Sequence, residues 1–101
     1  MSVTSELSHD GQELIIFIKG RFDFSAHQDF RSAYEDAAGA PRRFVVDLKG
    51  TNYLDSSALG MLLLLRGHAG GENSDIRLVN CNNDVETILT ISNFSKLFKI
   101  G

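Results

Sequence analysis

The sequence predicts an α/β protein, with a mixed, mostly parallel β-sheet of four to five strands and three helices packed on it. Three observations predict it. Short apolar runs rich in β-branched residues alternate with segments whose apolar residues recur at helical spacing. Glycine-containing turn signals separate many of these segments, and no linker or repeat interrupts them. The length of 101 residues suits one compact domain, so we expect a single domain over residues 1–101.

The strands are expected where apolar runs are short and end at turn residues. The clearest is the segment ELIIFIKG, which closes on Gly20. A weaker edge strand near residues 3–7 can pair with it through the turn His9-Asp10-Gly11. The other expected strands cover residues 44–48, 75–80 and 97–100, and residues 50–53 are expected to form a loop.

Three helices are expected near residues 25–38, 56–68 and 83–92. Ser25 with Gln28 resembles a capping box, and Asn83 with Glu86 gives a second cap pattern. The middle segment is apolar nearly all round, which predicts a largely buried helix. Its core-facing positions are expected among Leu62, Leu63 and Leu65.

Composition excludes several classes of function. The net charge of −3 gives no basic surface for nucleic acid or an anionic membrane. The polar N-terminus lacks the apolar core of a secretion signal, and the apolar run at residues 61–65 is too short to span a bilayer. A lone cysteine, Cys81, fits a reducing compartment, so we expect a cytoplasmic protein.

Sequence motifs for catalysis and cofactors are missing. There is no glycine-rich phosphate loop, and the three histidines have no zinc-ligand spacing, so neither a cofactor nor a metal is expected. A triad of Ser56, His68 and Asp47 can be drawn on paper, but no G-x-S-x-G motif supports it. Cys81 is expected to be a small core or cap-adjacent residue rather than a nucleophile.

The informative stretch is residues 47–60, which places two hydroxyl groups at the start of the middle helix. Free N–H groups and the positive end of the helix dipole would stabilise a phosphate there. Local chemistry alone favours the simpler interpretation that Asp55 or Ser56 is an N-cap.

A family resemblance changes that balance. Residues 54–60, LDSSALG, look like the D-S-S-G-L-G signature of STAS domains. They follow a strand reading VVDL, as in that family, and residues 18–23, IKGRFD, are similar to its "hydrophobic-x-G-x-[LF]-D" motif. The order of expected elements agrees with the STAS fold over nearly the whole chain.

The resemblance implies that a partner kinase phosphorylates Ser56, that Asp23 lies close to it, and that Asp47 lies at the end of its strand. It implies a partner-binding surface drawn from Asp23, Asp47, Asn52, Tyr53, Asp55, Ser57, Ala58 and Met61. Two features depart from the family pattern. Ala58 replaces the commoner Gly, and the chain stops at Gly101 where many relatives carry a further helix, which suggests a weak homodimer or a covering partner.

The leading hypothesis is a bacterial, non-enzymatic anti-sigma factor antagonist that regulates transcription by partner switching. Unphosphorylated, it would bind an anti-sigma factor or serine kinase, and a PP2C-type phosphatase would reset it. One alternative is a STAS scaffold outside sigma control, in stress or biofilm signalling. The other is a small serine hydrolase that uses Ser56.

Overall fold

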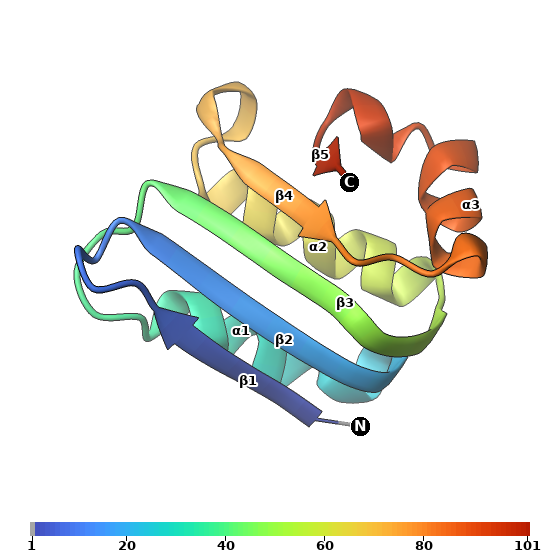
Figure 1. Cartoon of the computed structure of the whole chain (residues 1–101), viewed down its shortest axis with the longest axis horizontal. Helices are drawn as coiled ribbons and strands as arrows, with labels where there is room; N and C mark the ends of the chain where they lie inside the picture. The colour runs from blue at the N-terminus through green and yellow to red at the C-terminus, as the bar shows by residue number, and fades with distance from the viewer. Residues whose placement is uncertain (1) are drawn as a thin grey trace.

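The computed structural model describes residues 2–101 and confirms the α/β fold, with one five-stranded mixed sheet (Figure 1). The strands lie in chain order across the sheet: β1 (Ser2–Leu7), β2 (Glu13–Phe22), β3 (Arg43–Leu54), β4 (Ile76–Val79) and β5 (Lys99–Ile100). A short turn joins β1 to β2, so the two are antiparallel. The remaining neighbours are parallel, because a helix-containing crossover joins each pair.

The helices are α1 (His27–Glu35), α2 (Ser56–His68) and α3 (Asn83–Ile91), with 3₁₀ turns at Phe24–Ala26, Gly71–Asn73 and Phe94–Lys96. Figure 1 shows α1 and α2 behind the sheet, with α3 beyond the end of β4. Alternate residues of the central strands therefore point toward the helices and are buried, as Ile16, Val46 and Leu78 are. The opposite face of the sheet is turned toward the viewer and carries no helix.

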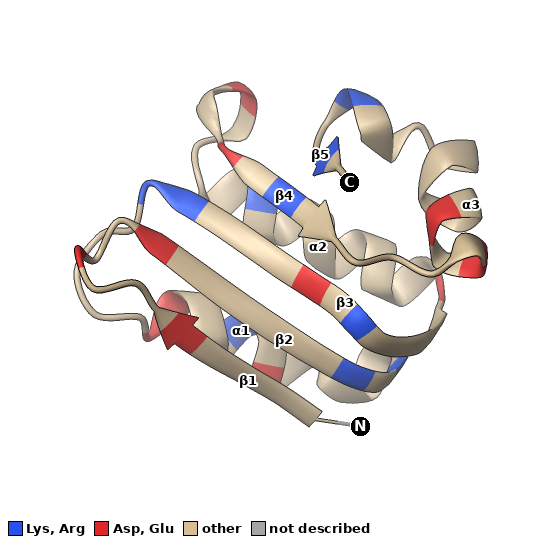
Figure 2. Ribbon diagram, in the orientation of Figure 1, with Lys and Arg blue, Asp and Glu red and all other residues tan. Residues whose placement is uncertain are grey.

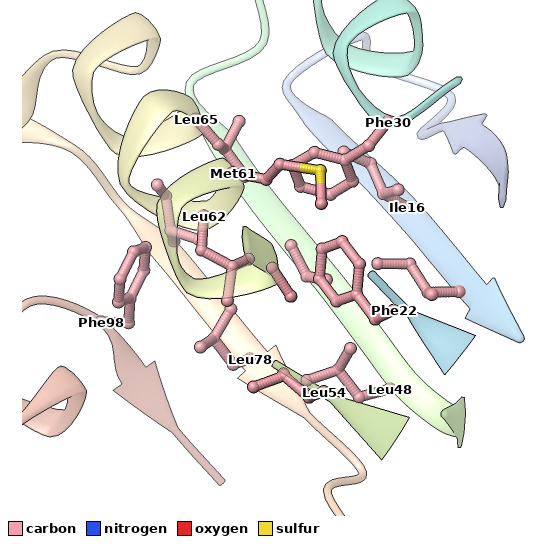
Figure 3. Packing of buried hydrophobic residues seen from close by; sticks show 14 of the residues in the cluster. Ile16, Phe22, Phe30, Leu48, Leu54, Met61, Leu62, Leu65, Leu78 and Phe98 are labelled. Carbon is pink, nitrogen blue, oxygen red and sulfur yellow. The ribbon is translucent and has the colours of Figure 1, made fainter. Parts of the chain in front are cut away.

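The core lies between the sheet and its helices (Figure 3). Phe22 from the end of β2 meets Phe30 of α1, with ring centroids 5.3 Å apart. From α2, Leu62 and Leu65 are fully buried against the strands. This packing holds the start of α2 at the carboxyl ends of β2 and β3.

Strand β3 is longer than the sequence predicted. The loop expected at residues 50–53 is wrong, since β3 continues to Leu54. Two register shifts in its pairing with β2 mark bulges that break the alternation of apolar and polar residues. They turn Thr51 inward, where it is 1% exposed and its hydroxyl donates to the Ile18 carbonyl at 2.9 Å. Asp47 therefore lies in mid-strand and not at the strand end.

The helices also differ from expectation in their ends and exposure. Ser25 is not the N-cap of α1, because Asp23 caps the preceding 3₁₀ turn and the α-helix begins only at residue 27. Asn82, one residue before the predicted Asn83, caps α3 by accepting from the Val85 amide. Helix α2 begins at Ser56, as predicted. One side of this helix is exposed to solvent, and Leu63 on that side is 44% exposed and therefore not a core position.

Candidate functional site

The first turn of α2 is built on Asp55, which follows β3 directly. Its extended backbone (φ −121°) places the carboxylate over the start of the helix, where Oδ1 accepts a hydrogen bond from the Ala58 amide at 3.1 Å. The Asp55 carbonyl accepts from the Leu59 amide at 3.2 Å and begins the helical ladder. Asp55 is thus the N-cap, and Ser56 is the first helical residue.

The two serines of this turn have different environments. The half-buried Ser57 donates its hydroxyl to Asp55 Oδ1 at 2.6 Å. Ser56 is exposed, and its hydroxyl makes no hydrogen bond with the residues that the structure describes. The Ser57 hydroxyl, followed by the Ala58 and Ser57 amides, holds the pKa of Asp55 below its usual value, although slight burial and the Asp23 charge oppose this. Ser56 is the hydroxyl that an incoming group can reach.

Asp23 stands beside this turn, at the end of β2. Its carboxylate accepts from the amide of Ser25 at 3.0 Å and from the Ser25 hydroxyl, and Arg21 Nε lies 3.4 Å from its Oδ2. The hydrogen bonds from Ser25 and then the contact with Arg21 lower the pKa of Asp23. The Asp23 charge also acts on Asp55, so two carboxylates flank the start of α2.

Arg21 is held by a second contact. Its guanidinium carbon lies 3.8 Å from the ring centroid of Tyr53, a cation–π arrangement between neighbouring residues of β2 and β3. Asp23 and the Tyr53 ring thus orient one exposed cation at this end of the sheet. The sequence singled out Tyr53 but not Arg21, although Arg21 lies within the motif at residues 18–23.

Exposed apolar groups extend this region along the helices. Ser56, Gly60 and Leu63 lie on one side of α2 at helical spacing, and all three are exposed. Leu64, on the next position, is 58% exposed. Phe24 is 70% exposed and stacks on His27 with centroids 5.2 Å apart. We call Gly60, Leu63 and Leu64, all on α2, the apolar patch. The prediction of a largely buried helix gave no sign that Leu63 and Leu64 are exposed.

The predicted partner-binding residues divide into three groups. Asp23, Asn52, Tyr53, Asp55 and Ser57 lie at the carboxyl ends of β2 and β3 or at the start of α2. Ala58 and Met61 lie in the core, 0% and 4% exposed, so they support the turn from beneath. Asp47 points to the helix-free face of the sheet, roughly 20 Å along β3 from Ser56. Its Oδ1 accepts from the Lys49 amide at 2.9 Å and Asn80 Nδ2 at 3.2 Å.

The hydrolase arrangement is not assembled. His68 lies at the far end of α2, about 18 Å along the helix from Ser56, and its ring packs 4.9 Å from that of Tyr34. Asp47 is on the other face of the sheet. Over residues 2–101, no cluster of three or more His, Cys, Asp or Glu side chains could hold a metal ion. None of the described helices is long and apolar enough to cross a membrane.

Cys81 sits immediately before the cap of α3. It is half-buried, and burial raises the pKa of its thiol above the ordinary value, with the charges of Glu86 and Asp47 acting in the same direction. A thiol with a raised pKa is a poor nucleophile at neutral pH. This agrees with the expectation of a structural, cap-adjacent cysteine.

The family model described as "Mlab, STAS domain" matches residues 5–99. The chain belongs to the STAS domain family. A STAS-domain containing protein of Pseudomonas aeruginosa (strain UCBPP-PA14) is 67% identical over 101 residues, which is 100% of both chains. A solved STAS domain of Rhodobacter sphaeroides, described as an antisigma-factor antagonist, is 30% identical, with a TM-score of 0.60 over 78% of this chain and 85% of that one.

The fold of this STAS domain is also that of SpoIIAA. The unphosphorylated anti-sigma factor antagonist SpoIIAA is 18% identical, with a TM-score of 0.82 over 99% of this chain and 88% of that one. The phosphorylated form of SpoIIAA, from Bacillus, gives 17% identity and a TM-score of 0.75 over 99% and 91%. The backbone arrangement described above is therefore common to both forms of that relative.

Proposed function

We propose that this STAS domain is an anti-sigma factor antagonist, a non-enzymatic partner-switching regulator controlled by phosphorylation of Ser56. One observation carries the proposal: Ser56 is exposed with a free hydroxyl at a helix N-terminus, whereas Asp55 engages the neighbouring Ser57. A kinase can therefore reach Ser56 without breaking the cap. The Rhodobacter relative described as an antisigma-factor antagonist and the two forms of SpoIIAA support the same assignment.

In the unphosphorylated state, the partner is an anti-sigma factor or serine kinase. The apolar patch supplies area that a partner can desolvate, and Gly60 carries no side chain that would hold a partner away. Asp23, Asn52 and Tyr53 would form the polar rim. A PP2C-type phosphatase restores this state by removing the phosphate. The cycle runs in the cytoplasm and needs no cofactor in the STAS domain itself.

Phosphorylation acts in this proposal by changing the surface. The new group brings about −1.5 to −2 charges beside Asp23 and Asp55. The first N–H groups of α2 accommodate this charge, so the fold has no reason to change. A carboxylate presented by the partner at ~5 Å is repelled by about 3 kcal/mol per unit charge, for an effective dielectric of ~20. Half of that weakens binding about tenfold.

The phosphosite is tested by intact-mass spectrometry after incubation with ATP and the cognate kinase. The parent protein and Ser57→Ala are expected to gain one phosphoryl group, and Ser56→Ala none. Ser57→Ala is the matched control, because it removes a hydroxyl from the same turn. Full phosphorylation of Ser56→Ala would move the site away from Ser56 and overturn the assignment.

Partner choice is tested by titrating candidate anti-sigma factors with unmodified and phosphorylated protein. We expect the unmodified form to bind at least tenfold more tightly. A protein that is phosphorylated on Ser56 yet binds no anti-sigma factor in either form would instead be a STAS scaffold in another signalling system, such as stress or biofilm control. Ester hydrolysis abolished by Ser56→Ala would support the hydrolase alternative.

A further inference from the structure

The helix-free face of the sheet is a second surface, separate from the start of α2. Strand alternation brings partly buried apolar side chains into neighbouring rows on this face, where Ile15 pairs with Val45 and Phe17 with Asp47, which in turn pairs with Val79. Figure 1 shows this side of β2, β3 and β4 without a covering helix. A sheet with apolar side chains on both faces is usually packed on both faces.

A hollow of about 480 Å³ lies on this face, lined by Phe17, Lys19, Asp47, Lys49 and other residues of β2 and β3. Phe17 is the aromatic residue of this lining, and the lining lysines Lys19 and Lys49 are exposed. The volume is large enough for a large apolar side chain. The Asp47 carboxylate already accepts two hydrogen bonds, from the Lys49 amide and from the Asn80 side chain.

Apart from Asp47, the unpaired charges on this face are three cations and one acid, Glu6 of β1 opposite Ile15, although the chain as a whole has a net charge of −3. Figure 2 shows the cations of β2, β3, β4 and β5. Lys19, Lys49 and Arg77 are exposed and form no ion pair with the described residues. Arg43 and Lys99 are paired with Glu13 and Asp75. The apolar rows thus have free cations on two sides.

We propose that this face binds an acidic amphipathic helix of a partner protein. Its apolar stripe would pack along Ile15, Phe17, Val45 and Val79, with one large side chain in the hollow. Aspartate or glutamate residues at the margins of the stripe would meet Lys19, Lys49 and Arg77. A helix fits because packing a helix stripe on an apolar sheet face is the common way to cover it. Charge complementarity selects an acidic helix over a basic one.

This binding does not depend on Ser56. The hollow and the start of α2 lie on opposite sides of the sheet and at different levels along β3. The domain can therefore hold one partner on the sheet face while Ser56 governs another at α2. Phosphorylation is expected to leave the affinity of the sheet face unchanged.

The test is a fluorescence anisotropy titration with a synthetic peptide of about 18 residues, long enough to form a helix. The peptide carries a leucine and phenylalanine stripe flanked by glutamates, and a control peptide carries lysines instead. Only the glutamate peptide is expected to bind, and more weakly at high salt. Lys49→Glu is expected to weaken its binding about fivefold. Lys96→Glu, an equal charge change in the 3₁₀ turn before β5, is expected to leave it unchanged.

Amide chemical shifts locate the peptide. We expect the largest changes at residues 15–19 and 45–49, and the same affinity for Ser56→Asp. The proposal is overturned if the glutamate peptide does not bind saturably, if both lysine variants weaken it equally, or if the shifts lie on α2. It is also overturned if Lys49→Glu instead abolishes self-association in sedimentation, or binding to vesicles of anionic lipid, with no effect on the peptide.

Discussion

At the start of α2, the hydrogen bonds of the Asp55 carboxylate determine which of the two serine hydroxyls is free to react. Asp55 satisfies the Ala58 amide and holds the Ser57 hydroxyl, and so leaves Ser56 as the free hydroxyl of the turn. The local signal D-S-S cannot by itself distinguish the two serines, because both can accept a phosphate at a helix N-terminus. The distinction comes from helix geometry, which turns Ser57 toward the cap and Ser56 toward solvent.

Replacing Asp55 tests the cap. We expect Asp55→Ala to lower the free energy of unfolding by about 1 kcal/mol, because the Ala58 amide in the first turn of α2 loses its hydrogen-bond acceptor. Asp55→Asn keeps an oxygen in place and is expected to stay within a few tenths of a kcal/mol of the parent. Urea denaturation of the three proteins at neutral pH measures the difference. Equal midpoints for Asp55→Ala and the parent would mean that the cap contributes nothing.

The same carboxylate makes stability depend on pH. The hydrogen bond from Ser57 lowers the pKa of Asp55 below its ordinary value in the folded protein, so the charged form is favoured by folding. The resulting stability is present above the unfolded-state pKa and is lost as pH falls through the folded-state pKa. We therefore expect the stability advantage of the parent over Asp55→Ala to decrease on acidification. Denaturation midpoints at a series of pH values from neutral downward measure this, and a growing advantage in acid would contradict it.

Within the element α2, one side of the helix is buried and the other is exposed. Leu62 and Leu65 are 0% exposed, whereas Leu63 and Leu64 face solvent beside Gly60. A run of four leucines carries no periodic signal, so the sequence alone could not separate the two sides. Packing against β3 and α1 determines which leucines of α2 are buried and which are exposed.

Two leucine variants test this division. Leu62→Ala is expected to cost about 2–5 kcal/mol, because it leaves a cavity in a closed core. The adjacent Leu63→Ala removes an exposed side chain and is expected to cost less than about 1 kcal/mol. Thermal or urea denaturation measures both. Similar losses for the two variants would contradict the observed orientation of α2.

A substitution at Gly60 is expected to raise the stability of the protein and not to lower it. A Cβ built at Gly60 meets no atom within 4 Å, so alanine fits without a clash. Gly60→Ala is expected to raise stability by about 0.5–1 kcal/mol through helix propensity. In the partner titration it is expected to weaken binding, if the partner approaches the α2 backbone closely at this position. A stabilised variant with undiminished affinity would place the partner elsewhere.

In the molecule as a whole, helices α1 and α2 cover one face of the sheet, and the proposed phosphosite, Ser56, lies at one end of it. The carboxyl ends of β2 and β3 bring Asp23 and Asp55 beside Ser56, although they are far apart in sequence. The first turn of α2 is held from beneath by the core residues Ala58 and Met61. We therefore expect a phosphate on Ser56 to change the surface that a partner contacts and not the fold.

Circular dichroism and amide chemical shifts test this surface mechanism. Phosphorylated and unmodified protein are expected to give superimposable far-ultraviolet spectra, with shift changes confined to the first turn of α2 and to Asp23 and its neighbours. Partner affinity is measured on the same samples. Lost affinity with a large loss of secondary structure would keep the switch and reject the surface mechanism.

The order of elements, the extent of α2 and the motif around Ser56 could be predicted without the structure. These follow from local patterns: short β-branched runs, apolar spacing, and a capping aspartate before an apolar segment. The length of β3 was not predictable in this way. Its bulges interrupt the alternation of side chains, so residues 50–53 resemble a loop in the sequence, although Gly50, Thr51 and Tyr53 pair with β2.

Which residues lie together at the site depends instead on packing between distant segments of the chain. The family motif placed Asp47 with the docking residues, but pairing within the sheet turns it to the helix-free face. It also placed Ala58 and Met61 there, although packing buries both. Conversely, the cation–π contact of Arg21 with Tyr53 requires two strands to lie in register. Side-chain direction depends on which partner strand or helix is present, and that information is not local in the sequence.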